Sequence, residues 1–316
     1  MRILLLALIS LLCSPGFAQT FPAKPIQIIV PLAPGGGTDL LARVIADKLR
    51  EKFGQPVTVE NRSGAAGNIG ADYVFKAAPD GHTLLFTQPA PLVVNQALYE
   101  KLPFEPERFV PVALVSEQDI MLAANPKLPA NNLQQLIAYA KANPGKLNFG
   151  SSGAGSAPHL AAELFSAMAG VKMVHVPYKG SGESQRATLA GDVDLTFFAF
   201  STALRHAKAG KLKALGVGGT KRNPQAPDVP AISEVLPGYS AASWTALVAP
   251  PGTPAPVVQT LSASVREIVK LPEVQKRLSD QGDQSFDLTP EQAAAFMREE
   301  RERWGGLIRR LGLKVQ

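Results

Sequence analysis

Cysteine is almost absent from this chain of 316 residues, in which Cys13 is the only one. A single cysteine excludes an intramolecular disulfide framework and a cysteine-based metal site. Charge is also sparse: 18% of the residues are charged and 46% are hydrophobic, which is enough apolar material for sizeable cores and excludes a disordered scaffold. Glycine and proline, 27 of each, follow no short period, so collagen-like and low-complexity chains are excluded as well.

Long apolar runs are confined to the N-terminal end. Arg2 precedes an apolar stretch over residues 3–12, and the small residues Gly16 and Ala18 follow it. This order is typical of a secretory signal peptide, and the stretch is well short of the ~20 residues that a membrane span needs. We therefore predict a signal peptide over residues 1–18, cleavage directly after it, and a soluble periplasmic product. Cleavage would also remove the single cysteine.

The net charge of +6 makes nucleic acid a partner to consider. The basic residues near the C-terminus, however, alternate with Glu299, Glu300 and Glu302, as on a solvated helix face. No aromatic residues interleave with a basic stripe, and an exported protein is poorly placed to meet nucleic acid. We expect no nucleic-acid partner, while the mild positive field is compatible with an anionic ligand.

Short β-rich runs alternate with helical patterns along the chain, which predicts an α/β fold with doubly wound sheets. The expected strands are 26–30, 57–60, 84–87, 120–124, 147–150, 173–177, 194–198, 212–217 and 243–249. The length favours two domains. Crossings before Asn125 and near Trp244 would let the last third of the chain rejoin the first. We predict domain 1 from residues 19–123 and 245–316, and domain 2 from residues 124–244.

Three glycine-rich loops, at 34–39, 63–68 and 151–158, follow predicted strands and open predicted helices. Thr38 or Asp39 is the expected N-cap after the first loop. Ligands of open α/β sheets bind at this edge, and helix N-termini attract anions. One helix end contributes only ~0.3–2 kcal/mol toward an anion, whereas micromolar binding needs ~8 kcal/mol. Any one loop can be a plain tight turn, but the three together favour an anion-binding cleft.

Sequence motifs of common enzymes are missing. The loops match neither G-x-G-x-x-G nor a P-loop, and Ser152 does not lie in G-x-S-x-G. The four histidines show no metal-ligand spacing, so we expect no metal and no cofactor. His159 follows a glycine-rich loop and is either a donor to an anion or a packed helix-start histidine. Asp192 and Asp194 flank a valine as an acid–base pair could, but a solvated turn is the favoured interpretation.

Short motifs, each weak alone, occur in one order over nearly the whole mature chain. They are FPAKPI at 21–26, PGGGTD at 34–39, GAAGNIG at 64–70, PDGHT at 79–83, VPYKG at 176–180 and APPGTP at 249–254. The ordered set resembles the Bug family, the extracytoplasmic solute receptors of tripartite tricarboxylate transporters. The resemblance implies two α/β domains of the periplasmic-binding-protein (Venus flytrap) type, joined by crossing strands. A small ligand, usually a carboxylate, would lie in the cleft between them.

The family's ligand loops carry over to several positions of this chain. The ligand-binding residues expected from them are Gly35, Gly36, Thr38, Asp39, Gln88, Ser151, Gly153, Ser156, His159, Tyr178 and Lys179. The expected partners are a small anionic solute and the permease subunits of a tripartite transporter, and we expect a monomer without catalysis. A solute sensor coupled to a signalling kinase and a hydrolase using a serine of 151–156 are the alternatives. The chain departs from the family at Gly36-Gly37 and over residues 88–91, which leaves the ligand open.

Overall fold

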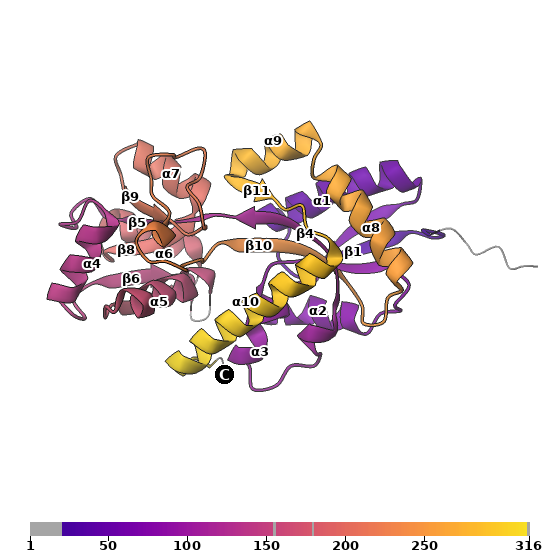
Figure 1. Cartoon of the computed structure of the whole chain (residues 1–316), viewed down its shortest axis with the longest axis horizontal. Helices are drawn as coiled ribbons and strands as arrows, with labels where there is room; N and C mark the ends of the chain where they lie inside the picture. Colours follow the sequence, from indigo (N-terminus) through magenta and orange to yellow (C-terminus); the bar gives the residue numbers. More distant parts are fainter. Residues whose placement is uncertain (1–20, 154–155, 179, 315–316) are drawn as a thin grey trace, which may run out of the picture.

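The computed structural model describes residues 21–153, 156–178 and 180–314. The predicted signal peptide and Lys179 lie outside the described residues. Two sheets, each covered by helices, follow one another along the long axis of the molecule (Figure 1).

The first sheet has the strand order β11-β4-β10-β3-β1-β2. Its strands are β1 Ile26–Val30, β2 Val57–Asn61, β3 Thr83–Thr87, β4 Val110–Gln118, β10 Ser243–Ala249 and β11 Asp283–Ser285. Strand β1 is parallel to β2 and β3, whereas β10 is antiparallel to β3 and β4.

The second sheet has the strand order β7-β6-β8-β5-β9. Its strands are β5 Ile120–Ala124, β6 Asn148–Ser151, β7 Val174–Pro177, β8 Leu195–Ala199 and β9 Lys213–Val217. Strand β6 is parallel to β7 and β8, and β5 is antiparallel to β8 and β9. Both sheets are therefore mixed. The strand–helix alternation predicts parallel neighbours and does not reveal the strands that enter each sheet by crossing from the other.

Helices cover the faces of both sheets. They are α1 Gly37–Phe53, α2 Asn68–Phe75, α3 Asn95–Leu98, α4 Leu133–Ala142, α5 Ala157–Ala169, α6 Ser181–Ala190, α7 Phe200–Lys208, α8 Ala255–Ile268, α9 Pro272–Gln281 and α10 Pro290–Leu311. Short helical turns are Ala65–Gly67, Ala90–Val94, Pro106–Arg108 and Ile232–Glu234. Helix α1 shows the common logic: Leu41, Ile45 and Leu49 recur at helical spacing and are buried in the first core. Within the described part of the chain, no helix combines the length and apolarity that crossing a bilayer requires.

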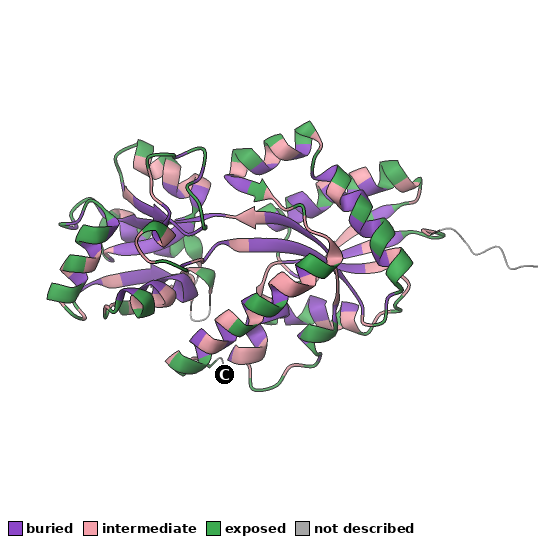
Figure 2. Cartoon of the chain, in the orientation of Figure 1, coloured by how far each residue is buried: buried purple, intermediate pink, exposed green. Residues whose placement is uncertain are grey.

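Two connections carry the chain between the sheets. Strand β4 ends at Gln118 and β5 begins at Ile120, so Asp119 alone separates a strand of one sheet from a strand of the other. The return leads from β9 to β10, which is buried over most of its length (Figure 2). The predicted domain boundary at 123/124 would cut β5, whereas the chain leaves the first sheet at Gln118.

Helix α10 is fastened to β10 by a buried carboxylate. Glu300 is 7% exposed and accepts hydrogen bonds from the indole nitrogens of Trp244 and Trp304, both at 3.1 Å. Arg303 forms an ion pair with the same carboxylate and stacks on the Trp304 ring at 4.5 Å. A buried carboxylate needs such partners, because an unpaired buried charge is strongly destabilising. The long helix is thereby held beside the crossing strand, where Trp304 reaches the cleft described below.

Candidate ligand-binding cleft

A cleft of about 860 Å³ lies at the junction of the two sheets. One wall consists of α1 and the segment after β3, which belong to the first sheet's side. The other wall consists of α5 and the end of β8. Between the walls lie the two connections where the chain passes from one sheet to the other, at Asp119 and before β10. Its lining includes Gly37, Thr38, Gln88, Gln118, Asp119, Ser156, Ala157, Ser243, Gln281 and Asp283. The volume falls in the range of small-molecule sites.

The structure brings together only some of the residues expected at the site. Thr38, Gln88 and Ser156 line the cleft. Lys179 lies outside the described residues. The other expected residues are described but do not line the cleft: Gly35, Gly36, Asp39, Ser151, Gly153, His159 and Tyr178. Several of them, Asp39, Ser151 and Gly153, make hydrogen bonds within the turns that open α1 and α5.

The N-cap residue in the turn between β1 and α1 is not one of those expected from the sequence. Helix α1 begins at Gly37 and its N-cap is Gly36, so the prediction that Thr38 or Asp39 caps the helix is wrong. Asp39 lies in the first helical turn, and its carboxylate accepts a hydrogen bond from the Gly35 N–H at 2.9 Å. The carboxylate thus reaches back over the turn from inside the helix, while Thr38 faces the cleft.

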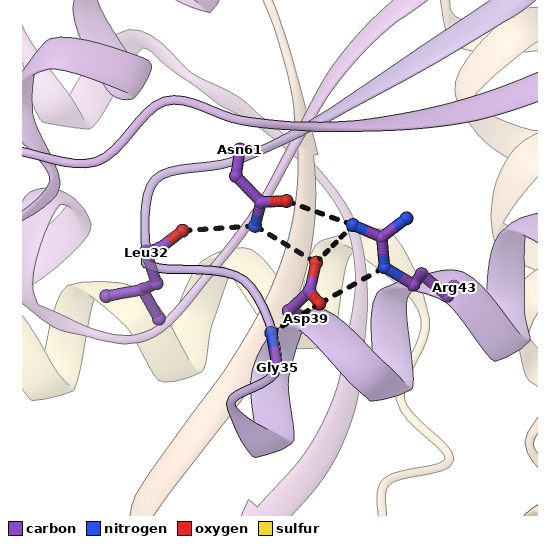
Figure 3. Close-up of polar contacts among 5 residues, drawn as sticks. All are labelled: Leu32, Gly35, Asp39, Arg43 and Asn61. Atoms are coloured by element: carbon purple, nitrogen blue, oxygen red, sulfur yellow. Dashed lines mark hydrogen bonds and ion pairs between the residues drawn. The ribbon is translucent and has the colours of Figure 1, made fainter.

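Asp39 is the centre of an ionic clamp (Figure 3). The residue is 1% exposed, and its carboxylate accepts hydrogen bonds from Arg43 Nε at 3.1 Å and Asn61 Nδ2 at 3.0 Å. The same Asn61 amide donates to the Leu32 carbonyl at 3.0 Å, which ties the end of β2 to the turn. Burial raises the pKa of Asp39, but the hydrogen bonds from Arg43, Gly35 and Asn61 outweigh it and leave the pKa below its ordinary value. The clamp is therefore ionised at neutral pH and fixes the turn.

The turn between β6 and α5 is held without charge. Helix α5 begins at Ala157, with Ser156 at the N-cap and Pro158 in the first turn, where a residue without an N–H is tolerated. The Ser156 hydroxyl donates to the Gly153 carbonyl at 2.6 Å, and Gly153 takes a φ of 115° that favours glycine. Ser151 Oγ accepts from the Gly153 N–H at 3.1 Å. No acidic residue occurs in the first turn of α5, so its positive end is not neutralised by its own sequence.

A pair of stacked histidines supports this second turn. His175 Nε2 lies 2.6 Å from Ser151 Oγ, and the His175 ring stacks on His159 with centroids 3.9 Å apart. His159 is 2% exposed and lies 3.6 Å from Glu163, so it is packed at the helix start. Burial, and then the charge of His159, lower the pKa of His175 to about 4. Ser151 is fully buried, so this serine–histidine pair positions a loop and presents no nucleophile to the cleft.

A chain of amide hydrogen bonds crosses the floor of the cleft. Gln88 Nε2 donates to Thr38 Oγ1 and to Gln118 Oε1, both at 3.1 Å. Gln118 Nε2 in turn donates to Asp283 Oδ2 at 3.4 Å. Gln118 and Asp283 are not among the residues expected from the sequence. They meet because β11 pairs with β4 and places Asp283 opposite Gln118. No local pattern signals a pairing between strands that lie so far apart in the chain.

Asp119, the residue at the crossing, is also absent from the sequence-based expectations. Its carboxylate accepts hydrogen bonds from the N–H groups of Ile120 at 2.9 Å and Gly219 at 3.0 Å, and from Asn223 Nδ2 at 3.4 Å. Asn223 also donates to the Gly282 carbonyl at 3.0 Å. Burial raises the pKa of Asp119 to about 6, although the hydrogen bonds counteract it. Asp119 thus fastens the crossing to the segment after β9.

The described residues contain no group of three or more potential metal ligands that could hold an ion. Among the described lining residues there is also no lysine, arginine or histidine. The polar groups among the described lining residues are therefore hydroxyls, amides, backbone groups and two carboxylates, Asp119 and Asp283.

Comparison with known proteins agrees with this architecture. The family model described as a tripartite tricarboxylate transporter family receptor matches residues 41–313. Protein BugT of Bordetella pertussis is 38% identical over 308 residues, which cover 96% of this chain and 94% of BugT. A structure of an R. palustris protein with adipate is 34% identical with a TM-score of 0.78, covering 93% of this chain and 100% of that one. MatC from Rhodopseudomonas palustris with bound malate is 34% identical with a TM-score of 0.74, covering 91% and 100%.

The fold is accordingly that of a two-domain Venus flytrap binding protein, as the sequence predicts. The family consists of solute-binding receptors, and its match extends over most of the chain. The chain belongs to the Bug family, the solute receptors of tripartite tricarboxylate transporters.

Proposed function

We propose that this receptor captures a small carboxylate-bearing solute in the cleft between its two sheets and delivers it to a permease in the membrane. The observation that carries the proposal is the cleft itself. Two helices begin at it, with Gly37 and Thr38 of α1 on one wall and Ser156 and Ala157 of α5 on the other. Free N–H groups at helix starts suit a carboxylate, because they are donors at the positive end of the helix dipole. In α5 the Ala157 N–H would act in this way, since Pro158 has no N–H.

Neutral donors would hold the carboxylate in place of a cationic side chain. Thr38 reaches the cleft with a hydroxyl that accepts from Gln88 and keeps its own hydrogen to donate, whereas the Ser156 hydroxyl and both N–H groups of the Gln88 amide already donate within the protein. The residues behind them, Asp39 and Ser151 above all, keep the two turns in shape. The adipate and malate held by two similar proteins are carboxylates of suitable size.

Closure of the cleft would occur at the two crossings. A ligand that contacts both walls binds the closed form better than the open one and so shifts the population toward it. Asp119 and the segment before β10 are the places where the chain passes between the sheets, so we assign the bending to them. The closed form would then dock on the permease subunits of a tripartite transporter. The predicted signal peptide supports a periplasmic location, and we propose that the receptor acts there as a monomer.

A thermal-shift screen tests the function. Purified protein is unfolded by heat alone and with mono-, di- and tricarboxylates, amino acids and aromatic acids. A solute at a hundred times its Kd adds ~2.7 kcal/mol of stability, an easily measured rise in Tm. If neutral solutes raise the Tm and no carboxylate does, the proposed ligand class is wrong.

A paired substitution tests the site. Thr38→Ala combined with Ser156→Ala removes one hydroxyl from each wall, and we expect carboxylate binding to weaken at least tenfold while the Tm of the free protein changes little. The matched control is Thr260→Ala with Ser233→Ala, two hydroxyls outside the cleft lining whose bonds are to nearby carbonyls. Equal affinities for the double variant and its control would remove these walls from the site.

A further inference from the structure

Charged side chains are distributed unevenly in the cleft, and the carboxylate of Asp283 accepts few hydrogen bonds. Asp119 and Asp283 both line the cleft and are 7% and 9% exposed. Asp119 accepts from two backbone N–H groups and a side-chain amide. Among the described residues, Asp283 receives one side-chain hydrogen bond, from Gln118 at 3.4 Å. A carboxylate has about four acceptor positions, so Asp283 keeps spare capacity beside the cleft.

The surroundings of Asp283 do not compensate its charge. The cleft lining offers no lysine, arginine or histidine among the described residues. Burial, and in addition the neighbouring charge of Asp119, raise the pKa of Asp283 to about 6. At neutral pH it is still mainly ionised, and a buried charge of this kind is costly until a cation or further donors approach it.

The wall formed by α5 lacks negative charge and is therefore suited to an anion. The first turn of α5 carries no acidic residue, and its N-cap, Ser156, faces the cleft. In the first turn of α1 the carboxylate of Asp39 already places a negative charge, and it accepts from the Gly35 N–H just before the helix. Helix starts attract anions, so the α5 side is the better place for a ligand carboxylate. The Gln88–Gln118 chain leads along the floor to Asp283.

We propose that the solute is a zwitterion, an amino acid with one carboxylate at the start of α5 and one ammonium group at Asp283. The proposal rests on the function proposed above and names the class of its solute. An ammonium group donates three hydrogen bonds, which match the spare acceptors of Asp283, and its charge compensates the buried carboxylate. A second ligand carboxylate at the same place would meet Asp283 and Asp119 with no cation between them. The cleft therefore discriminates against di- and tricarboxylates by like-charge repulsion.

Matched solutes test the proposal by isothermal titration of the purified, extensively dialysed protein. Amino acids with neutral side chains and ω-amino acids of four to six carbons are compared with succinate, glutarate and adipate. We expect at least one amino acid to bind tenfold or more tightly than the dicarboxylate of equal carbon number. This ratio is measured on the unaltered protein and does not depend on the folding of any variant.

The variant Asp283→Asn keeps the shape and removes the charge. We expect it to weaken amino acid binding at least tenfold and to leave dicarboxylate binding equal or stronger. The matched control is Asp280→Asn, an exposed carboxylate nearby that pairs with Lys276 and lies outside the cleft lining.

Three results would overturn the assignment. Dicarboxylates that bind the unaltered protein as tightly as every amino acid would remove the zwitterion and leave the carboxylate function intact. The same follows if Asp283→Asn matches Asp280→Asn for all solutes. If no solute with a carboxylate binds at all, the proposed function fails together with this inference.

Discussion

The two turns that open α1 and α5 look alike in sequence, but the first is held by an ionised side chain and the second by hydrogen bonds between neutral groups. The first is stiffened by an ionised, buried Asp39 that pairs with Arg43 and accepts from Asn61. The second is stiffened by neutral groups, with Ser151 bound to a histidine whose pKa is lowered to about 4. A glycine-rich turn before a helix is therefore not automatically an anion site. We expect such a turn to bind an anion only where no acidic side chain of the protein already lies at the helix start.

The largest expected effect comes from adding a carboxylate to the neutral turn. Ala157 is exposed at the first position of α5 and lines the cleft, so Ala157→Asp places a negative charge where the solute carboxylate is proposed to bind. We expect the affinity for the bound solute to fall by about 100-fold, which is ~2.7 kcal/mol. The free protein should stay as stable, because an acidic residue in the first turn favours a helix. Titration calorimetry and thermal unfolding measure the two quantities.

The counterpart on the other wall is Gly37→Asp at the first position of α1. A Cβ there meets Gln281 Oε1 at 3.4 Å, so a side chain fits. We expect a loss of affinity of tenfold or less, because the α1 turn already contains Asp39 and the carboxylate is proposed to bind at α5. Similar losses at both positions would mean that the two turns share the anion equally.

Removing the ionic clamp should destabilise the folded protein. Asp39→Ala leaves the Gly35 N–H without its acceptor, while the Asn61 amide keeps only the Leu32 carbonyl and Arg43 keeps only Asn61 Oδ1. We expect the free energy of unfolding in urea to fall by about 2 kcal/mol at pH 7. The control is Asp47→Ala on the same helix, whose exposed ion pair with Arg50 should contribute less than about 0.5 kcal/mol.

The pH dependence of the clamp has a definite sign. The pKa of Asp39 is lower in the folded protein than its ordinary value, so its stabilisation is present above that ordinary value and is lost as the pH falls through the folded pKa. The difference between the unaltered protein and Asp39→Ala should therefore shrink in strong acid. A difference that stays constant from pH 7 to pH 2 would show that the carboxylate contributes shape and not charge.

Sequence analysis located both turns, because a strand that ends in glycine and continues as a helix has local signals. It misplaced the cap of α1, since the Asp39 carboxylate finds its partners in Arg43 and in Asn61, at the end of another strand. For His159 it left two interpretations, and the structure shows the packed position, although the role in binding stays a prediction.

The floor of the cleft was beyond sequence reasoning for a different reason. Gln118 and Asp283 are adjacent only because β11 pairs with β4, and Asp119 is notable only because the chain changes sheet there. Neither relation has a local pattern, since both depend on contacts between segments far apart in the chain. His175 was missed in the same way, because it reaches Ser151 through the pairing of β7 with β6.

We expect the smallest effect on stability from a substitution of His175, which supports the turn before α5. His175→Phe keeps a ring stacked between His159 and Phe149 but removes the hydrogen bond to Ser151 and the titrating group. We expect a loss of about 1 kcal/mol at pH 7 in urea unfolding, typical of one hydrogen bond. Because the folded pKa of His175 is about 4 and its ordinary value is higher, the unfolded chain binds more protons between the two. The histidine's contribution is therefore present above the ordinary value and is lost as the pH falls toward 4.

The unaltered protein should accordingly lose more stability than His175→Phe between pH 7 and pH 5. Asp119 and Asp283, whose pKa values are raised to about 6, have the opposite slope in acid, but both proteins share it and it cancels in the difference. Parallel pH profiles would mean that His175 is protonated in the folded protein as readily as in the unfolded chain. The second turn would then carry a positive charge near pH 6, and the contrast between an ionic and a neutral turn would reduce to a contrast between two ionic ones.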